Sequence, residues 1–208
     1  MKDRKSLMFL LPFGIILVMI LLGHLIDFSE YPSAAADGAA WDKSWEMLAK
    51  AVGVEPPGHG LTLQENNTVL AGDDTYYASW TIGDSTPYVN AEGKDAALYP
   101  AQLYLLLYGC ADATSAQKAC DDFLAHAREN YAVEAERAET HNTQDYLVLD
   151  YTCGSDTNPY ARGCSAFAVR GNYVLAAELA CTEEFEGDAA QILSDFLDGC
   201  HYSADLPQ

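Results

Sequence analysis

The sequence predicts an α+β fold, with a mainly antiparallel sheet of about six to seven strands flanked by helices and preceded by one N-terminal transmembrane helix. Three observations favour this fold class. Segments with strand-like alternation follow one another across short turns, two amphipathic helical segments are inserted among them, and a long apolar run precedes them all. Because strands that are adjacent in sequence mostly pair through hairpins, we expect the sheet to be antiparallel.

The apolar run Leu7–Ile26 is the predicted transmembrane segment. As a helix it is about 30 Å long, enough to cross a bilayer. Basic residues precede it, whereas Asp27 and Glu30 follow it, which predicts a cytoplasmic N-terminus and export of the rest of the chain. We therefore expect a cytoplasmic stub at 1–6, a transmembrane signal-anchor (or uncleaved signal peptide) at 7–26, a tether at 27–36 and an extracytoplasmic α+β domain at 37–208.

A cleaved signal peptide is the alternative for this segment. Ala34, Ala35 and Ala36 form an A-x-A pattern, and cleavage there would secrete a protein that begins at Asp37. The apolar run is longer than an ordinary signal core, however, and about ten residues separate it from the cleavage pattern. We therefore expect a single-pass protein of the cell membrane with its C-terminal domain outside the cytoplasm.

The first element after the tether is a predicted helix that ends at Gly53. Trp41 and Trp45 give it an aromatic face, which we expect to pack on the domain core. The alternative is that these tryptophans rest at the membrane surface. Strands are then expected at 61–64, 68–72 and 75–83, the last with Tyr76, Ala78, Trp80 and Ile82 on one face.

The second half of the domain begins, after a polar loop, with residues 101–109, which are apolar on both faces and therefore indicate a central strand. A helix is expected over 112–130, capped by Asp112 or Thr114. Four strands are expected at 132–139, 145–153, 164–170 and 173–181, the first at an edge and the last two joined by a hairpin at Gly171-Asn172. A final helix over 187–199 directs Ala189, Ile192, Leu193, Phe196 and Leu197 inward.

This order of elements, from about Leu61 to Cys200, resembles the PsbP/Mog1/DcrB-like fold, in which helices flank an antiparallel sheet. The resemblance lies in element order and assigns no site residues. It implies an accessory or binding protein more than an enzyme.

The charge distribution excludes one class of partner. The net charge is −20, and the three acidic and three basic residues up to Glu30 cancel, so the rest of the chain carries all of it. Such a body is repelled by phosphate backbones, so we expect no nucleic-acid binding. The acidic run from Glu183 to Asp188 suits the N-terminus of the final helix; a calcium site is the lesser interpretation, because no D-x-D-x-D-G loop is present.

The six cysteines are all in the predicted exported domain, where an even number favours disulfides; they are Cys110, Cys120, Cys153, Cys164, Cys181 and Cys200. No C-x-x-C pair is present, so we expect neither structural zinc nor thioredoxin-like chemistry. Because Cys153 ends one predicted strand and Cys164 begins the next, we expect a disulfide between them. Cys110–Cys120 and Cys181–Cys200 bridges are feasible, and a Cys164–Cys181 link is the main alternative.

No linear catalytic motif is present, and we predict no catalytic residues, metal or cofactor. Tyr104 and Tyr108 on the central strand, and Tyr160 in the loop between Cys153 and Cys164, are expected to pack in the core; an aromatic ligand surface is the alternative. The sequence thus favours a non-catalytic binding or accessory module of the cell envelope. Its ligand-binding residues are unknown, and its partner is an unidentified protein or envelope component. The alternative is an extracytoplasmic hydrolase whose site has no linear motif.

Overall fold

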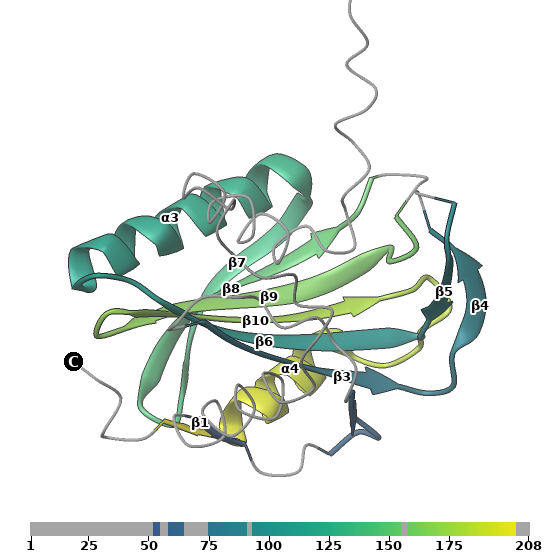
Figure 1. Cartoon of the computed structure of the whole chain (residues 1–208), viewed down its shortest axis with the longest axis horizontal. Coiled ribbons are helices and arrows are strands. Elements are labelled where there is room, and N and C mark those ends of the chain that lie inside the picture. Colours follow the sequence, from purple (N-terminus) through teal and green to yellow (C-terminus); the bar gives the residue numbers. More distant parts are fainter. Residues whose placement is uncertain (1–51, 55–57, 65–74, 91–92, 155–157, 203–208) are drawn as a thin grey trace, which may run out of the picture.

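The computed structural model describes residues 52–54, 58–64, 75–90, 93–154 and 158–202. These residues form an antiparallel sheet of seven strands with two helices, which confirms the predicted α+β architecture (Figure 1). The predicted transmembrane segment, the tether, the strand at 68–72 and residues 37–51 of the tryptophan helix lie outside the described residues. Neither of the described helices has the length and apolar character needed to span a membrane.

The sheet is antiparallel throughout, and its central strands are buried on both faces. In spatial order its strands are β2 (Thr62–Leu63), β3 (Thr75–Ile82), β6 (Ala101–Gly109), β10 (Tyr173–Cys181), β9 (Arg162–Arg170), β8 (Gln144–Thr152) and β7 (Ala132–His141). The apolar run of β6 is therefore central, as predicted. The predicted hairpin between β9 and β10 is also confirmed, since Tyr173 lies opposite Arg170 and Gly171 has a φ of 58°, which glycine adopts without strain.

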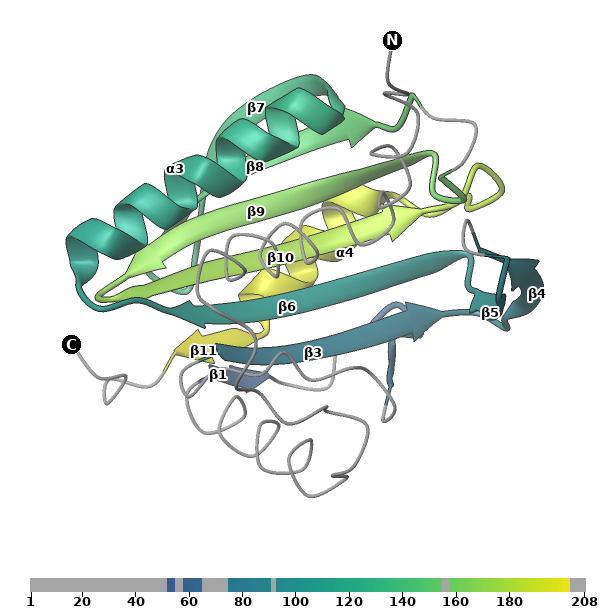
Figure 2. The ribbon, with the colours of Figure 1, turned by 45° about the horizontal axis from the view of Figure 1, so that its top comes forward.

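One helix covers each face of the sheet (Figures 1 and 2). Helix α3 (Ala113–Asn130) packs on β7, β9 and β10, and helix α4 (Ala189–Asp198) packs on the other side of the same strands. Asp112 caps α3 by accepting the Ser115 N–H at 2.7 Å, and Asp188 caps α4 in the same way. The five residues predicted to face inward from α4 are all buried.

Two short pairs of strands lie outside the large sheet, and neither pair was predicted. Strand β1 (Val52–Val54) pairs with β11 (Cys200–Tyr202), so the prediction that Val52 and Gly53 close a helix is wrong. Strands β4 (Thr86–Val89) and β5 (Asp95–Leu98) form a hairpin in the region predicted to be a polar loop (Figure 1). The strands of both pairs are short. β4 and β5 are largely exposed, whereas β1 and β11 are far apart in sequence, and such strands give little periodic signal.

Candidate functional site

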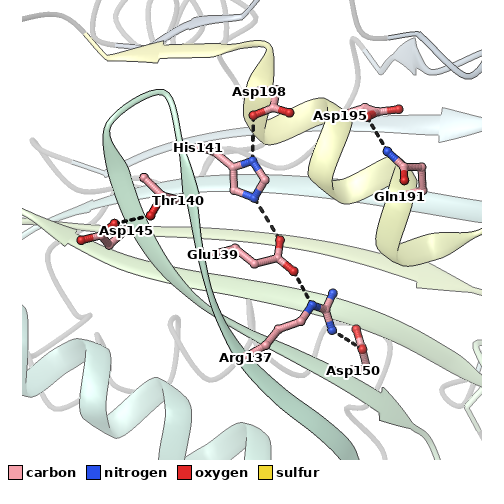
Figure 3. A network of polar contacts seen from close by, with 9 residues as sticks. All are labelled: Arg137, Glu139, Thr140, His141, Asp145, Asp150, Gln191, Asp195 and Asp198. Atoms are coloured by element: carbon pink, nitrogen blue, oxygen red, sulfur yellow. Dashed lines mark hydrogen bonds and ion pairs between the residues drawn. The ribbon is translucent and has the colours of Figure 1, made fainter.

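A chain of polar contacts joins the hairpin between β7 and β8 to the C-terminal end of α4 (Figure 3). His141 is central to it, with Nδ1 2.8 Å from Asp198 Oδ1 and Nε2 3.0 Å from Glu139 Oε2. Arg137 donates hydrogen bonds to both Glu139 and Asp150. We call these five residues the Arg137–Asp198 network.

The strand geometry explains why these side chains meet. Residues 137, 139 and 141 alternate along β7 and therefore share one face, the face covered by α4. The turn that follows contains Asn142 and Thr143, both with positive φ. From this turn Asn142 Nδ2 donates to Cys200 O at 2.9 Å and also to Asp198 O, so the hairpin tip is fixed to the end of α4.

His141 is enclosed by carboxylates. It is buried, and a carboxylate oxygen lies within hydrogen-bond distance of each of its ring nitrogens. Burial raises the pKa of Glu139, but hydrogen bonds from His141 and Arg137 outweigh this effect and lower it overall. Because both nitrogens of His141 face carboxylates that also belong to β7 and α4, the arrangement acts as a structural clasp.

Cys164 is a candidate nucleophile next to a member of this network. It lies directly opposite Asp150 in the register of β8 and β9, on the α4 face. Burial and a hydrogen bond to Asp150 raise the pKa of the Cys164 thiol well above its usual range. Because the thiolate is the reactive form of cysteine, this thiol lacks the reactivity of a catalytic nucleophile.

The predicted Cys153–Cys164 disulfide is wrong. Cys153 N–H donates to Ala161 O, three residues before Cys164, and the two side chains belong to cores on opposite faces of the sheet. All six cysteines are free thiols. Cys110, Cys120 and Cys153 belong to the α3 side, and Cys164, Cys181 and Cys200 to the α4 side.

The competing Cys164–Cys181 pair shares a face, but only as diagonal neighbours, since Cys164 pairs with Leu179. Diagonal positions across strands are about 7–8 Å apart, outside the usual range for a disulfide. The register therefore also disfavours this alternative.

A second polar group lies inside the α3 face, around Glu178 in the middle of β10. Tyr151 on β8 and Tyr131 at the end of α3 both donate to Glu178 Oε1, the latter at 3.4 Å. The rings of Tyr131 and Tyr151 stack with centroids 4.1 Å apart. Tyr104 lies opposite Glu178 on β6, and Tyr77 stacks on Tyr104. We call Glu178 and these four tyrosines the Glu178 cluster.

A glycine makes room for the contact between Tyr151 and Glu178. Gly163 is the register partner of Tyr151, and a Cβ at Gly163 would lie 2.5 Å from the Tyr151 hydroxyl oxygen. Burial raises the pKa of Glu178 to about 7, although hydrogen bonds from Tyr151 and Tyr131 act in the opposite direction. The carboxyl thus exchanges its proton near pH 7, but only 5% of the Glu178 residue is exposed to solvent.

The structure places the tyrosines singled out in the sequence mostly in the interior. Tyr104 and Tyr160 are buried, and Tyr160 donates to Gln102 Oε1 at 2.9 Å, which confirms the packing interpretation for both. Tyr108 is partly buried against Phe123. Glu178 was missed, although it is the single charged residue of an otherwise apolar predicted strand, which is a detectable signal.

Within the described residues, no group of three or more His, Cys, Asp or Glu side chains is arranged to hold a metal ion. In the acidic loop before α4, Arg162 Nη2 donates to the carbonyl oxygens of Phe185 and Gly187 at 2.6 and 3.3 Å. An arginine therefore organises this loop from within.

No known protein family and no curated protein matches the sequence. Among solved structures, the cyanobacterial PsbP (CyanoP) of Synechocystis sp. PCC 6803 is similar over 70% of this chain and 94% of its own, with 10% identity and a TM-score of 0.39. The protein PA94 of Pseudomonas aeruginosa, of unknown function, is similar over 49% of this chain and 85% of its own, with 14% identity and a TM-score of 0.34.

A structure from Bacteroides thetaiotaomicron has 7% identity and a TM-score of 0.28, over 64% of this chain and 49% of its own. A PsbP protein, from the family whose fold the element order resembles, is thus among these similar structures. Similarity at this level concerns the fold alone and identifies no function.

Proposed function

We propose that this chain is a membrane-anchored extracytoplasmic module that binds a positively charged protein or cell-envelope component and has no catalytic role. The proposal rests on the contacts that the described arginines make. Each contacts another group of the same domain: Arg128 pairs with Glu136 at the surface, Arg137 with Glu139 and Asp150, Arg162 with two backbone carbonyls, and Arg170 lies over the ring of Tyr202.

The consequence is an outer surface dominated by carboxylates. Exposed acidic residues occur on α3, on β7, in the loop before α4 and on α4 itself: Asp121, Asp122, Glu129, Glu134, Glu183, Glu184, Glu186, Asp188, Asp195 and Asp198. Such a surface attracts cationic partners, speeds their association and repels anionic ones. This supports a basic protein segment or another cationic envelope component as the partner.

The groups that an enzyme would need are engaged or enclosed. His141 has carboxylates at both nitrogens, burial raises the pKa of the Cys164 thiol, and Glu178 is buried. The hydrolase alternative rests on Glu178, because a carboxyl with a pKa of about 7 is typical of an acid–base catalyst. A buried carboxyl does not contact substrate in this conformation, so the observations favour binding.

The proposal is tested with the full-length protein in membranes of the producing cells. Photo-reactive residues at the exposed positions of Glu134 and Glu184 should capture a basic partner. Capture should weaken as salt rises from about 50 to 300 mM, because exposed charges are screened. The double variant E183Q/E186Q should lower capture at the Glu184 position, whereas the matched variant K118Q should not.

Two results would contradict the proposal. One is an acidic partner whose capture is insensitive to salt. The other is hydrolysis of an ester, phosphate, glycoside or peptide substrate that E178Q abolishes. The membrane anchor is tested separately: the protein should stay in the membrane fraction after an alkaline wash, and an intact protein in the medium that begins at Asp37 would contradict it.

A further inference from the structure

Three elements meet at the carboxyl group of Glu178. Strand β10 carries Glu178, β8 supplies Tyr151, and the junction between α3 and β7 supplies Tyr131. Tyr131 is also the C-cap residue of α3, where its N–H donates to Ala127 O at 2.9 Å. A single carboxyl oxygen therefore connects the end of α3 to the centre of the sheet.

The groups that face this carboxyl are neutral at physiological pH. They are Tyr77 from β3, Tyr104 from β6, Tyr131, Tyr151 and the thiol of Cys153, and burial raises the pKa of each. None of these groups is cationic, and the hydroxyl of Ser165, opposite Glu178 on β9, is a further neutral donor whose hydrogen bond lowers the pKa of Glu178 only in part against the effect of burial. An ionised Glu178 would thus be a buried charge without a counter-ion, which is unfavourable.

We infer that Glu178 is a proton-dependent latch for α3: its neutral carboxyl holds the C-terminal end of the helix on the sheet, and loss of the proton loosens that end as pH rises through neutrality. The proton passes to water, and the carboxylate that remains is stabilised when the helix end moves away and water reaches it. Burial supports this assignment, since it raises the pKa of Glu178 to about 7.

Other titratable groups also lie near the end of α3. Arg128 bridges α3 to Glu136 on β7 at 2.8 Å, and this hydrogen bond raises the pKa of Arg128 and lowers that of Glu136. His126 lies on α3, and burial lowers its pKa. The comparison between the wild type and E178Q therefore assigns a change in α3 between pH 6 and 8 to Glu178.

Amide hydrogen exchange of the full-length protein in lipid nanodiscs tests the latch. Protection of the amides from Cys120 to Tyr131, corrected for intrinsic exchange rates, should fall about tenfold from pH 6 to 8, as expected for a group with a folded pKa near 7 that titrates normally when opened. In E178Q, where the side chain is neutral at every pH, this step should disappear. The control E134Q removes an exposed carboxylate of β7 and should keep it.

The variant Y131F provides a second test that does not need a change at Glu178. It removes the hydroxyl at the helix end and leaves Tyr151 in place, so α3 should lose protection at pH 6 and show a smaller pH step. Constant α3 protection in the wild type, or an unchanged step in E178Q or Y131F, would overturn the inference. Exchange of the α3 amides at pH 8 that is no faster than exchange of the most protected amides of β6, β9 and β10 would also overturn it, because α3 would then open only with global unfolding.

Discussion

Cys164 lies directly opposite Asp150 in the antiparallel register of β8 and β9, and the thiol donates a hydrogen bond toward the carboxylate. Cys153 follows Asp150 by three residues. Because side chains alternate between the two faces along a strand, Cys153 lies on the other face of the sheet. The two cysteines that bracket the loop are therefore close in sequence but separated by the sheet. Three thiols on each side also mean that at most one disulfide can form within each core.

The first prediction concerns these thiols. Peptide mapping of the unreduced protein should yield no cross-linked Cys153–Cys164 peptide. In the native protein an alkylating reagent should label the partly exposed Cys110 first, because the four buried thiols are shielded and the pKa of Cys153 is raised further, to about 12. Denaturation should release all six for labelling. A Cys153–Cys164 cross-link would show that the strand register is incorrect.

Much of the fold could be predicted because its elements have strong local patterns. The apolar run of β6 marked the centre of the sheet, the alternation of charges marked β7 as an edge strand, and Asp112 marked the start of α3. The pairing of β1 with β11 could not be predicted, since it joins segments from opposite ends of the domain. Pairing of this kind depends on tertiary packing, which local periodicity does not encode.

The Arg137–Asp198 network shows the same limit at the level of a site. Alternation along the predicted strand at 132–139 places Arg137 and Glu139 on one face, but that strand ended before His141, which the structure includes in β7. The contact of His141 with Asp198 spans 57 residues and depends on where α4 ends beneath the hairpin. The disulfide prediction failed for a related reason: the strand boundaries were approximate, and a shift of one residue moves a side chain to the other face.

The second prediction tests the network as a clasp. H141A should lower the free energy of unfolding by about 2 kcal/mol, because it leaves Glu139 and Asp198 without their shared donor. Part of this cost should be absent when Asp198 is already neutral, so the pair H141A and D198N should show a coupling of about 1 kcal/mol in chemical denaturation. Additive effects of the two changes would contradict the clasp. Lys118 on α3 and Glu184 in the loop before α4 are exposed and lie on different elements, so the control pair K118A and E184Q should show no coupling.

The third prediction follows from the lowered pKa of Glu139. A carboxylate with a depressed pKa stabilises the folded state above its unfolded pKa, and this contribution is lost as pH falls through the folded pKa. Stability should therefore decrease in acid more steeply for the wild type than for E139Q, as measured by thermal unfolding from pH 6 down to 3. Parallel curves for the two proteins would exclude Glu139 as a source of acid sensitivity.

The fourth prediction concerns the space above Gly163. A methyl group there would clash with the Tyr151 hydroxyl and with the carbonyl of Leu179. G163A should therefore lower the free energy of unfolding by about 1–3 kcal/mol, a typical cost of overpacking. It should also displace Tyr151 from Glu178, and removal of the hydroxyl in G163A/Y151F should recover part of the stability. Wild-type stability in G163A would show that the Tyr151 ring lies elsewhere.

The last prediction is the effect of Glu178 on global stability. Its folded pKa of about 7 lies above the ordinary value for glutamate, so the folded state binds the proton more tightly than the unfolded state does. The stabilisation that protonated Glu178 adds to the free energy of unfolding is therefore fully present below the unfolded pKa. It is lost as pH rises to about 7, and the total loss is about 3 kcal/mol. Chemical denaturation from pH 4.5 to 8.5 should show this decline in the wild type and in E134Q, and a flatter profile in E178Q. A wild-type protein whose stability rises from pH 5 to 8 by the same amount as that of E178Q would show that Glu178 is ionised and compensated in the folded state.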